Sequence, residues 1–170
     1  MQRMLRKIIR VGTVTEPPGK ADNRIETLGA LLDEAIRRRF QGSLAIRQVD
    51  AGSCNGCELE IHALNNPYYD IERFGIHFVA SPRHADMLLV TGPVSRNMET
   101  ALRMTYDAVP NPKLVVAAGD CAVRGGEFGC SYALSGKVAN VIPVDVAVQG
   151  CPPTPADLIQ GILTALGLAR

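Results

Sequence analysis

The sequence predicts an α/β fold in which a mostly parallel sheet lies between two layers of helices. Short apolar runs rich in Val, Ile, Leu and Ala alternate with amphipathic segments of helical length from residue 44 onward. Strands and helices that alternate in this way build parallel sheets, because the chain returns through a helix after each strand. Residues 114–118 are apolar throughout, which is typical of a strand covered on both faces.

Residues 24–40 are the first segment with helical periodicity. Apolar residues recur every three or four positions, and Asn23 and Gly42 suit the start and the end of a helix. Two interpretations stay open for this helix: it packs on the core of its own chain, or it is offered to a membrane surface or a partner subunit.

The α/β alternation then continues to the end of the chain. Helix 95–109 is bounded by Pro93 and Pro110, and Pro155 suits the first position of the last helix. The apolar runs predict strands at residues 44–49, 76–80, 87–91, 114–118 and 144–148. The amphipathic segments predict helices at residues 57–65, 95–109 and 155–166.

The length of 170 residues is that of one domain. We expect residues 44–170 to form the cofactor-binding domain and residues 1–43 to form an N-terminal docking arm with its amphipathic helix. Residues 1–22 show no clear periodicity, and Pro17-Pro18-Gly19 is a breaker, so we expect a partner to order this arm. Residues 1–50 carry ten Lys or Arg and six Asp or Glu, a basic bias that suggests docking.

The composition also restricts the function. No run approaches the length of a membrane span, and the basic start lacks the apolar stretch of a secretory signal, so we expect a cytoplasmic chain. Thiols stay reduced there, so five cysteines point to metal binding or catalysis rather than to disulfides. Trp is absent and aromatic residues are few, which argues against nucleic acid as a partner.

Four of the cysteines follow predicted strands. Cys54 and Cys57 follow the first strand as a Cys-Asn-Gly-Cys pair, Cys121 follows the run 114–118, and Cys151 follows the run 144–148. The loops after parallel strands share one edge of the sheet, so three loops could bring four thiolates around one cofactor. Iron–sulfur clusters are held by four such thiolates.

Other chemistries for these cysteines are weaker. Structural zinc sites generally use two close pairs, whereas Cys121 and Cys151 are single cysteines 30 positions apart. A redox-active dithiol formed by Cys54 and Cys57 stays open, although it leaves the two singles unexplained. We expect Cys130, the fifth cysteine, to be a small buried residue near the cluster, with a substitute ligand as the alternative.

These motifs resemble the family of the complex I 20 kDa subunit and the NiFe-hydrogenase small subunit. The resemblance covers about residues 44–167 and is carried by three stretches. They are Gly52-Ser53-Cys54-Asn55-Gly56-Cys57-Glu58, Gly119-Asp120-Cys121-Ala122, and Ile142-Pro143-Val144-Asp145-Val146 with Gly150-Cys151-Pro152-Pro153-Thr154-Pro155.

The resemblance implies a flavodoxin-like fold that holds one 4Fe–4S cluster on Cys54, Cys57, Cys121 and Cys151. The two-residue gap between Cys54 and Cys57 is similar to that of hydrogenases, whereas complex I members have adjacent cysteines there. The short form without an extra cluster region is similar to small subunits of membrane-bound hydrogenases of the formate hydrogenlyase type. A complex I-like quinone oxidoreductase subunit is the alternative.

By this resemblance the chain is an electron-transfer subunit that is not catalytic alone. The implied partners are a large catalytic subunit (NiFe hydrogenase or complex I 49 kDa-like), a ferredoxin-like iron–sulfur subunit, and a membrane subunit reached through the N-terminal region. The implied location is the inner face of the cell membrane, to which the chain is peripheral.

Glu58 directly follows Cys57 and is a candidate for proton transfer, since a carboxylate beside a buried cluster can exchange protons. Its alternative role is a helix first-turn acid that stabilises the helix dipole. We expect His62 to be a helix-surface residue, with pairing to Glu58 as the alternative, and His77 and His84 to be structural. We expect Glu60 to stabilise the helix dipole, and Arg96 and Arg124 to be solvated surface residues.

Overall fold

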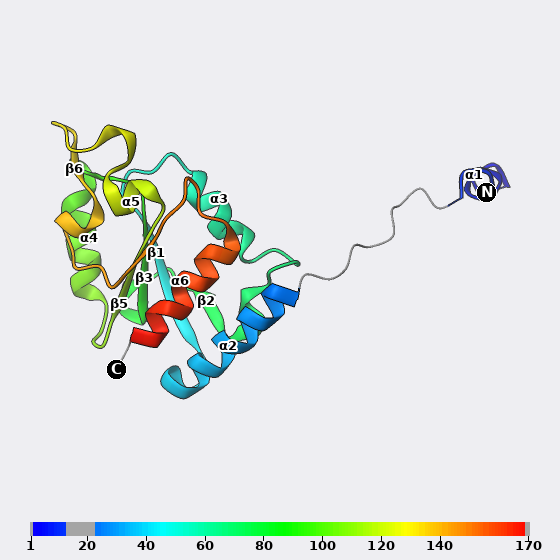
Figure 1. Ribbon diagram of the computed structural model, residues 1–170, viewed down its shortest axis with the longest axis horizontal. Helices are drawn as coiled ribbons and strands as arrows, with labels where there is room; N and C mark the ends of the chain where they lie inside the picture. The colour runs from blue at the N-terminus through cyan, green and yellow to red at the C-terminus, as the bar shows by residue number, and fades with distance from the viewer. Residues whose placement is uncertain (1, 13–22, 169–170) are drawn as a thin grey trace.

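The computed structural model describes residues 2–12 and 23–168. Its main sheet has five parallel strands in the order β2-β1-β3-β5-β7 (Figure 1). This is the flavodoxin-like order, in which later strands lie on both sides of β1. The predicted α/β class and parallel sheet are therefore confirmed. The strands are β1 (Leu44–Asp50), β2 (Ile76–Phe78), β3 (Met87–Thr91), β5 (Leu114–Ala118) and β7 (Val146–Val148).

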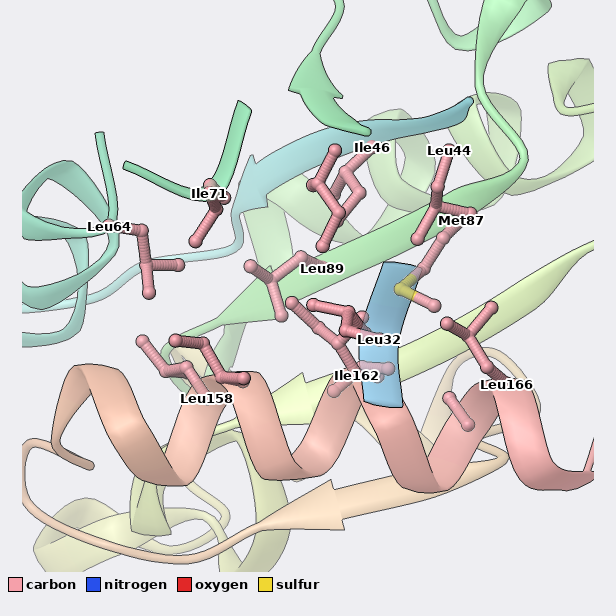
Figure 2. Close-up of a cluster of buried hydrophobic side chains, with 14 of the residues drawn as sticks. Leu32, Leu44, Ile46, Leu64, Ile71, Met87, Leu89, Leu158, Ile162 and Leu166 are labelled. Carbon is pink, nitrogen blue, oxygen red and sulfur yellow. The ribbon is translucent and has the colours of Figure 1, made fainter. Parts of the chain in front are cut away.

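Helices cover both faces of this sheet and complete three layers. The helices are α2 (Asn23–Phe40), α3 (Gly56–Ala63), α4 (Arg96–Ala108), α5 (Asp120–Arg124) and α6 (Pro155–Leu168). One buried cluster joins α2, α3 and α6 to the sheet, and a second joins α4 and α5 to its other face. Figure 2 shows the first cluster, where Leu32 of α2 and Ile162 of α6 approach Met87 and Leu89 of β3.

Helix α2 contributes to the same core as the sheet. Leu32 and Ile36 have no exposed surface, and a Cβ atom on Gly29 would lie 2.1 Å from the ring of Phe74, so only glycine allows this contact. The observed packing agrees with the first of the two interpretations of this helix. A division of the chain at residue 43 stays a prediction.

The N-terminal segment differs from our expectation. Residues 2–11 form a helix, α1 (Gln2–Val11), although the sequence analysis found no periodicity there. Its apolar residues do follow helical spacing, but four interspersed cations within ten residues hid the pattern. The Pro17-Pro18-Gly19 breaker lies outside the described residues.

The strand starts also differ slightly from the predicted bounds. β7 begins at Val146 rather than at residue 144, because the Asp145 carboxylate accepts a hydrogen bond from the amide of Val115 at 2.8 Å. Asp86 does the same before β3, accepting from the amide of Ala45 at 2.9 Å. A carboxylate therefore replaces a backbone acceptor where each of these two strands joins the sheet.

The sequence analysis missed several short elements. They are the antiparallel pair β4 (Val94–Ser95) and β6 (Leu134–Gly136), the helix α5, and the 3₁₀ turns η1 (Ile71–Phe74), η2 (Pro82–His84), η3 (Gly126–Phe128) and η4 (Val138–Asn140). Two to five residues are too few to show a periodicity. Among the described residues, no helix combines the length and the hydrophobicity that a membrane crossing needs.

Candidate metal centre

Three loops meet at the carboxyl edge of the sheet, after β1, β5 and β7. The amide of Gly119 donates to the carbonyl of Val148 at 2.8 Å, and the amide of Asp120 donates to the carbonyl of Gly150 at 2.8 Å. The Asp120 carboxylate in turn accepts from the amide of Gly150 at 3.1 Å. These bonds fix the loop of Cys121 to the loop of Cys151.

The loop after β1 is held by its own side chains. Asp50 accepts hydrogen bonds from the amides of Gly52 at 2.8 Å and Ser53 at 2.7 Å, and Ser53 accepts from the amide of Asn55 at 3.2 Å. Asn55 has a positive φ of 72° and precedes α3. The loop therefore places Cys54 just before the helix and Cys57 in its first turn.

Two glycines keep space open beside the sulfurs. A Cβ atom on Gly119 would lie 2.5 Å from Cys57 Sγ, and one on Gly126 would lie 2.6 Å from Cys121 Sγ. Both glycines also have a positive φ, of 92° and 61°. Any larger residue at either position would displace a sulfur or strain the backbone.

The four thiols influence one another electrostatically. The pKa of Cys57 is raised to about 12, first by burial and then by the negative charges of Glu58, Cys121, Cys54 and Cys151. The pKa of Cys121 is also raised, first by burial and then by Cys151 and Cys54. The four cysteines that the sequence analysis selected therefore lie close enough for their charges to interact.

The donor set fits a cofactor with positively charged metal ions. Four soft sulfur donors, of which Cys57 and Cys121 have a raised pKa, gain from a metal charge that replaces their protons. Cys54 and Cys151 are exposed and the other two are half-buried, so the site opens at the surface. Within residues 2–12 and 23–168, however, no three His, Cys, Asp or Glu side chains stand as a ready set of metal ligands, so the ligand set stays a prediction.

Cys130 lies elsewhere and is exposed, which makes the expectation of a buried residue wrong. Its thiol donates weakly, at 3.6 Å, to the carbonyl of Ser135 in β6. It lines a cavity of about 340 Å³ together with Arg124 and Lys137. It is not among the groups that shift the pKa of Cys57 or Cys121.

Glu58 is buried, with 7% of its surface exposed. The Thr91 hydroxyl donates to Glu58 Oε1, whereas Glu58 Oε2 has no hydrogen-bond partner among the described residues. The carboxylate lines a cavity of about 290 Å³ with Arg47 and the exposed His62. Arg47 and Thr91 were missed by the sequence analysis, since both lie inside strands that read as purely structural.

The remaining polar candidates have ordinary surroundings. Arg124 donates to the Gln149 side chain at 2.6 Å and lies 3.7 Å from Asp120, and Arg96 donates to the carbonyl of Tyr132 at 3.2 Å. His77 Nδ1 lies 3.4 Å from the Ser43 hydroxyl. These contacts all lie at the surface. Glu60 and His84 remain outside the site.

The sequence of this edge identifies the family. A sequence model described as NADH ubiquinone oxidoreductase, 20 kDa subunit, matches residues 54–165, which include all four selected cysteines. The chain belongs to this family. The matched segment runs from the loop after β1 into α6, so the 20 kDa subunit family shares the sheet edge described above.

Similar members of the 20 kDa subunit family are named as subunits of larger enzymes. The chain is 44% identical over 151 residues to formate hydrogenlyase subunit 7 of Escherichia coli. This match covers 89% of this chain and 58% of that protein. It is 48% identical over 118 residues to a probable membrane-bound hydrogenase subunit of Pyrococcus furiosus, covering 69% and 71%. The chain therefore spans less than two thirds of the length of the first relative.

A solved structure supports the same relationship. The chain resembles a subunit of the membrane-bound sulfane sulfur reductase, an archaeal respiratory membrane complex, with a TM-score of 0.66 and 34% identity. The match covers 81% of this chain and 74% of that one. This solved relative is thus part of a respiratory membrane complex.

Proposed function

We propose that this chain is the electron-transfer subunit of a membrane-bound NiFe hydrogenase complex. Cys54, Cys57, Cys121 and Cys151 would hold one 4Fe–4S cluster, which supplies one-electron transfer when bound. The observation that carries the proposal is that the loops of Cys121 and Cys151 are hydrogen-bonded at one sheet edge, where the charges of the other three thiols help to raise the pKa of Cys57.

The residues of the chain have three tasks in this function. Gly119 and Gly126 keep the space beside the sulfurs open. The first turn of α3, which holds Cys57, presents free amides that stabilise negative charge on sulfur. Asp120 fixes the Cys121 and Cys151 loops to each other, so the sulfurs stay in place when charge moves.

The surface position of the site indicates where partners dock. Cys54 and Cys151 are exposed. A large catalytic subunit that covers this edge would therefore lie close enough to the cluster to exchange electrons with it, and would exclude water from it. A ferredoxin-like iron–sulfur subunit would exchange electrons from another side. A membrane subunit would contact the N-terminal region, and the complex would lie at the cytoplasmic face of the membrane.

The relatives favour hydrogenase chemistry over the alternative. Two similar proteins are named as subunits of formate hydrogenlyase and of a membrane-bound hydrogenase. The name of the family model keeps a complex I-like, quinone-reducing complex as the second candidate. In either case the same four cysteines would hold the cluster that carries the electron.

Glu58 is a candidate for proton transfer next to this site. It is buried, one of its oxygens is unpartnered, and it lines a cavity with the exposed His62. Protons could enter from solvent through this cavity and reach the carboxylate behind Cys57. The charge of an electron at the site would then be balanced locally.

The decisive experiment is anaerobic purification of the complex, followed by iron and sulfide analysis and EPR of the reduced sample. We expect about four irons per chain assigned to these cysteines, with a reduced-cluster signal that Cys54→Ala removes. Stoichiometric zinc without iron would contradict the proposal. Hydrogen-dependent dye reduction that persists without quinone would favour hydrogenase over the second candidate.

A further inference from the structure

We propose that α1 binds directly to an anionic lipid surface, lying in the plane of the membrane with its apolar face in the bilayer. The inference goes beyond the proposed electron transfer, because it concerns contact with lipid rather than with another subunit. It rests on the exposure, the face pattern and the charge of α1.

The apolar residues of α1 are exposed to an unusual degree. The side chains of Met4, Leu5, Ile8 and Ile9 are 68%, 54%, 61% and 82% exposed. Figure 1 shows α1 apart from the sandwich, so none of the elements that the structure describes covers these side chains. An apolar patch of this kind marks an interaction site, since burying each isoleucine gains about 1.5–3 kcal/mol.

The two kinds of residue separate cleanly around the helix. At 3.6 residues per turn, Met4, Leu5, Ile8, Ile9 and Val11 fall within an arc of about 160°. The four cations of α1 fall within about 100° on the opposite side: they are Arg3, Arg6, Lys7 and Arg10. A basic face opposite an apolar face is the pattern of helices that lie at a membrane interface.

The positive charge of α1 favours anionic lipid over a second copy of the chain as the partner of its apolar face. The described part of α1 carries four cations and no acid. A second copy of α1 would bring four more positive charges to the contact, so self-association is disfavoured. The anionic inner leaflet of a cell membrane is instead complementary to every charged residue of the helix.

Helix length gives a further reason for a binding surface. Isolated helices shorter than about 12–15 residues are marginal in water, and α1 has ten. An interface that covers the apolar face would stabilise the helix as well as bind it. The surrounding chain would then be tethered to the membrane by contacts additional to those of its complex.

The test is flotation of the full chain, loaded with its cofactor under anaerobic conditions, on lipid vesicles. One set of vesicles contains phosphatidylcholine alone, and the other contains about one part phosphatidylglycerol to three parts phosphatidylcholine. We expect binding to the anionic set that weakens at high salt. Ile8→Asp with Ile9→Asp, and separately Arg6→Glu with Lys7→Glu, should each lower the bound fraction at least about tenfold.

Two single-residue controls carry changes of the same kind elsewhere. Met104→Asp alters an apolar residue of α4 that is 67% exposed, and Arg39→Glu reverses an exposed cation of α2. Both controls should bind vesicles like the unchanged chain, and the visible absorption of the cofactor should show that all variants are folded.

Several results would overturn the proposal. One is equal binding to neutral and anionic vesicles. Another is binding that the α1 variants leave intact. A third is failure to bind vesicles while α1 variants still detach the chain from its complex, which would place α1 on a protein subunit instead. Because vesicle binding needs no electron transfer, its failure would leave the proposed function standing.

Discussion

Gly119, at the end of β5, borders the sulfur of Cys57 so closely that a Cβ atom on residue 119 would lie 2.5 Å from it. Residues 57 and 119 belong to different strand–helix units, and they meet only because β1 and β5 both flank β3 in the sheet. The absence of one side chain at position 119 therefore decides whether the sulfur of Cys57 can face the other thiols.

The first prediction concerns this glycine. Gly119→Ala should lower the free energy of unfolding by about 2 kcal/mol or more, because the new methyl group meets the sulfur and φ is +92°. Bound iron per chain should fall as well. The control is Gly167→Ala in α6, where nothing lies within 4 Å of the added carbon and which should keep both stability and iron. Equal behaviour of the two variants would contradict the prediction.

The second prediction separates the cysteines. Cys151→Ala should abolish the reduced-cluster EPR signal and leave less than one cluster per chain, since three sulfurs cannot complete the ligand set. Cys130→Ala should keep the signal, because Cys130 is exposed at the β6 loop and influences neither Cys57 nor Cys121. Loss of the signal in both variants would instead assign Cys130 to the site.

The third prediction is a pH dependence of the metal-free chain. The folded state raises the pKa of Cys57 from 9.0 to about 12, mainly by burial, so it binds this proton more tightly than the unfolded state. The corresponding stability is fully present below pH 9 and is lost as pH rises toward 12. Urea unfolding between pH 8 and pH 11 should show this loss, and Cys57→Ala should reduce it. An identical pH profile for the variant would rule out Cys57 as its source.

The fourth prediction tests Glu58. Glu58→Gln should preserve the cluster signal but change the pH profile of hydrogen turnover in the complex, because the amide cannot exchange a proton as a carboxylate does. Glu60→Gln, two residues along α3 and outside the cavity lining, is the matched control. If both variants keep the profile of the unchanged complex, Glu58 serves only as a structural acid.

The fifth prediction concerns the boundary at residue 43. Leu32 of α2 is fully buried against the sheet, so Leu32→Ala should lower the free energy of unfolding by about 2–5 kcal/mol. Leu31→Ala, one position along on the exposed side, should change it little. A single cooperative transition lowered only by the first variant would show that α2 unfolds with residues 44–168.

The strands were predictable because their chemistry is uniform. Residues 114–118 are apolar without interruption, and the structure buries all five. Cys54, Cys57, Cys121 and Cys151 were selected because each follows such a strand, and the parallel order explains why loops distant in sequence meet. Helix α1 was not predicted because cations alternate with its apolar residues along the sequence. Helix α5 was not predicted because five residues are too few to show a helical period.

The environment of Glu58 could not be predicted from the sequence. Its burial depends on Thr91 at the end of β3 and on the cavity shared with Arg47, and strand pairing alone brings these residues beside α3. A polar residue inside an otherwise apolar strand, such as Thr91, was the available signal. Cys130 is exposed shortly before β6, and the β4–β6 pair is too short to be recognised from the sequence.

The distribution of the four sulfurs over β1, β5 and β7 has a consequence for biogenesis. No piece that ends before residue 151 contains all of them, and β1, β3, β5 and β7 must be paired before the set exists. A cofactor held by all four sulfurs would thus find a competent acceptor only after these strands have assembled, which would make its insertion a checkpoint on folding.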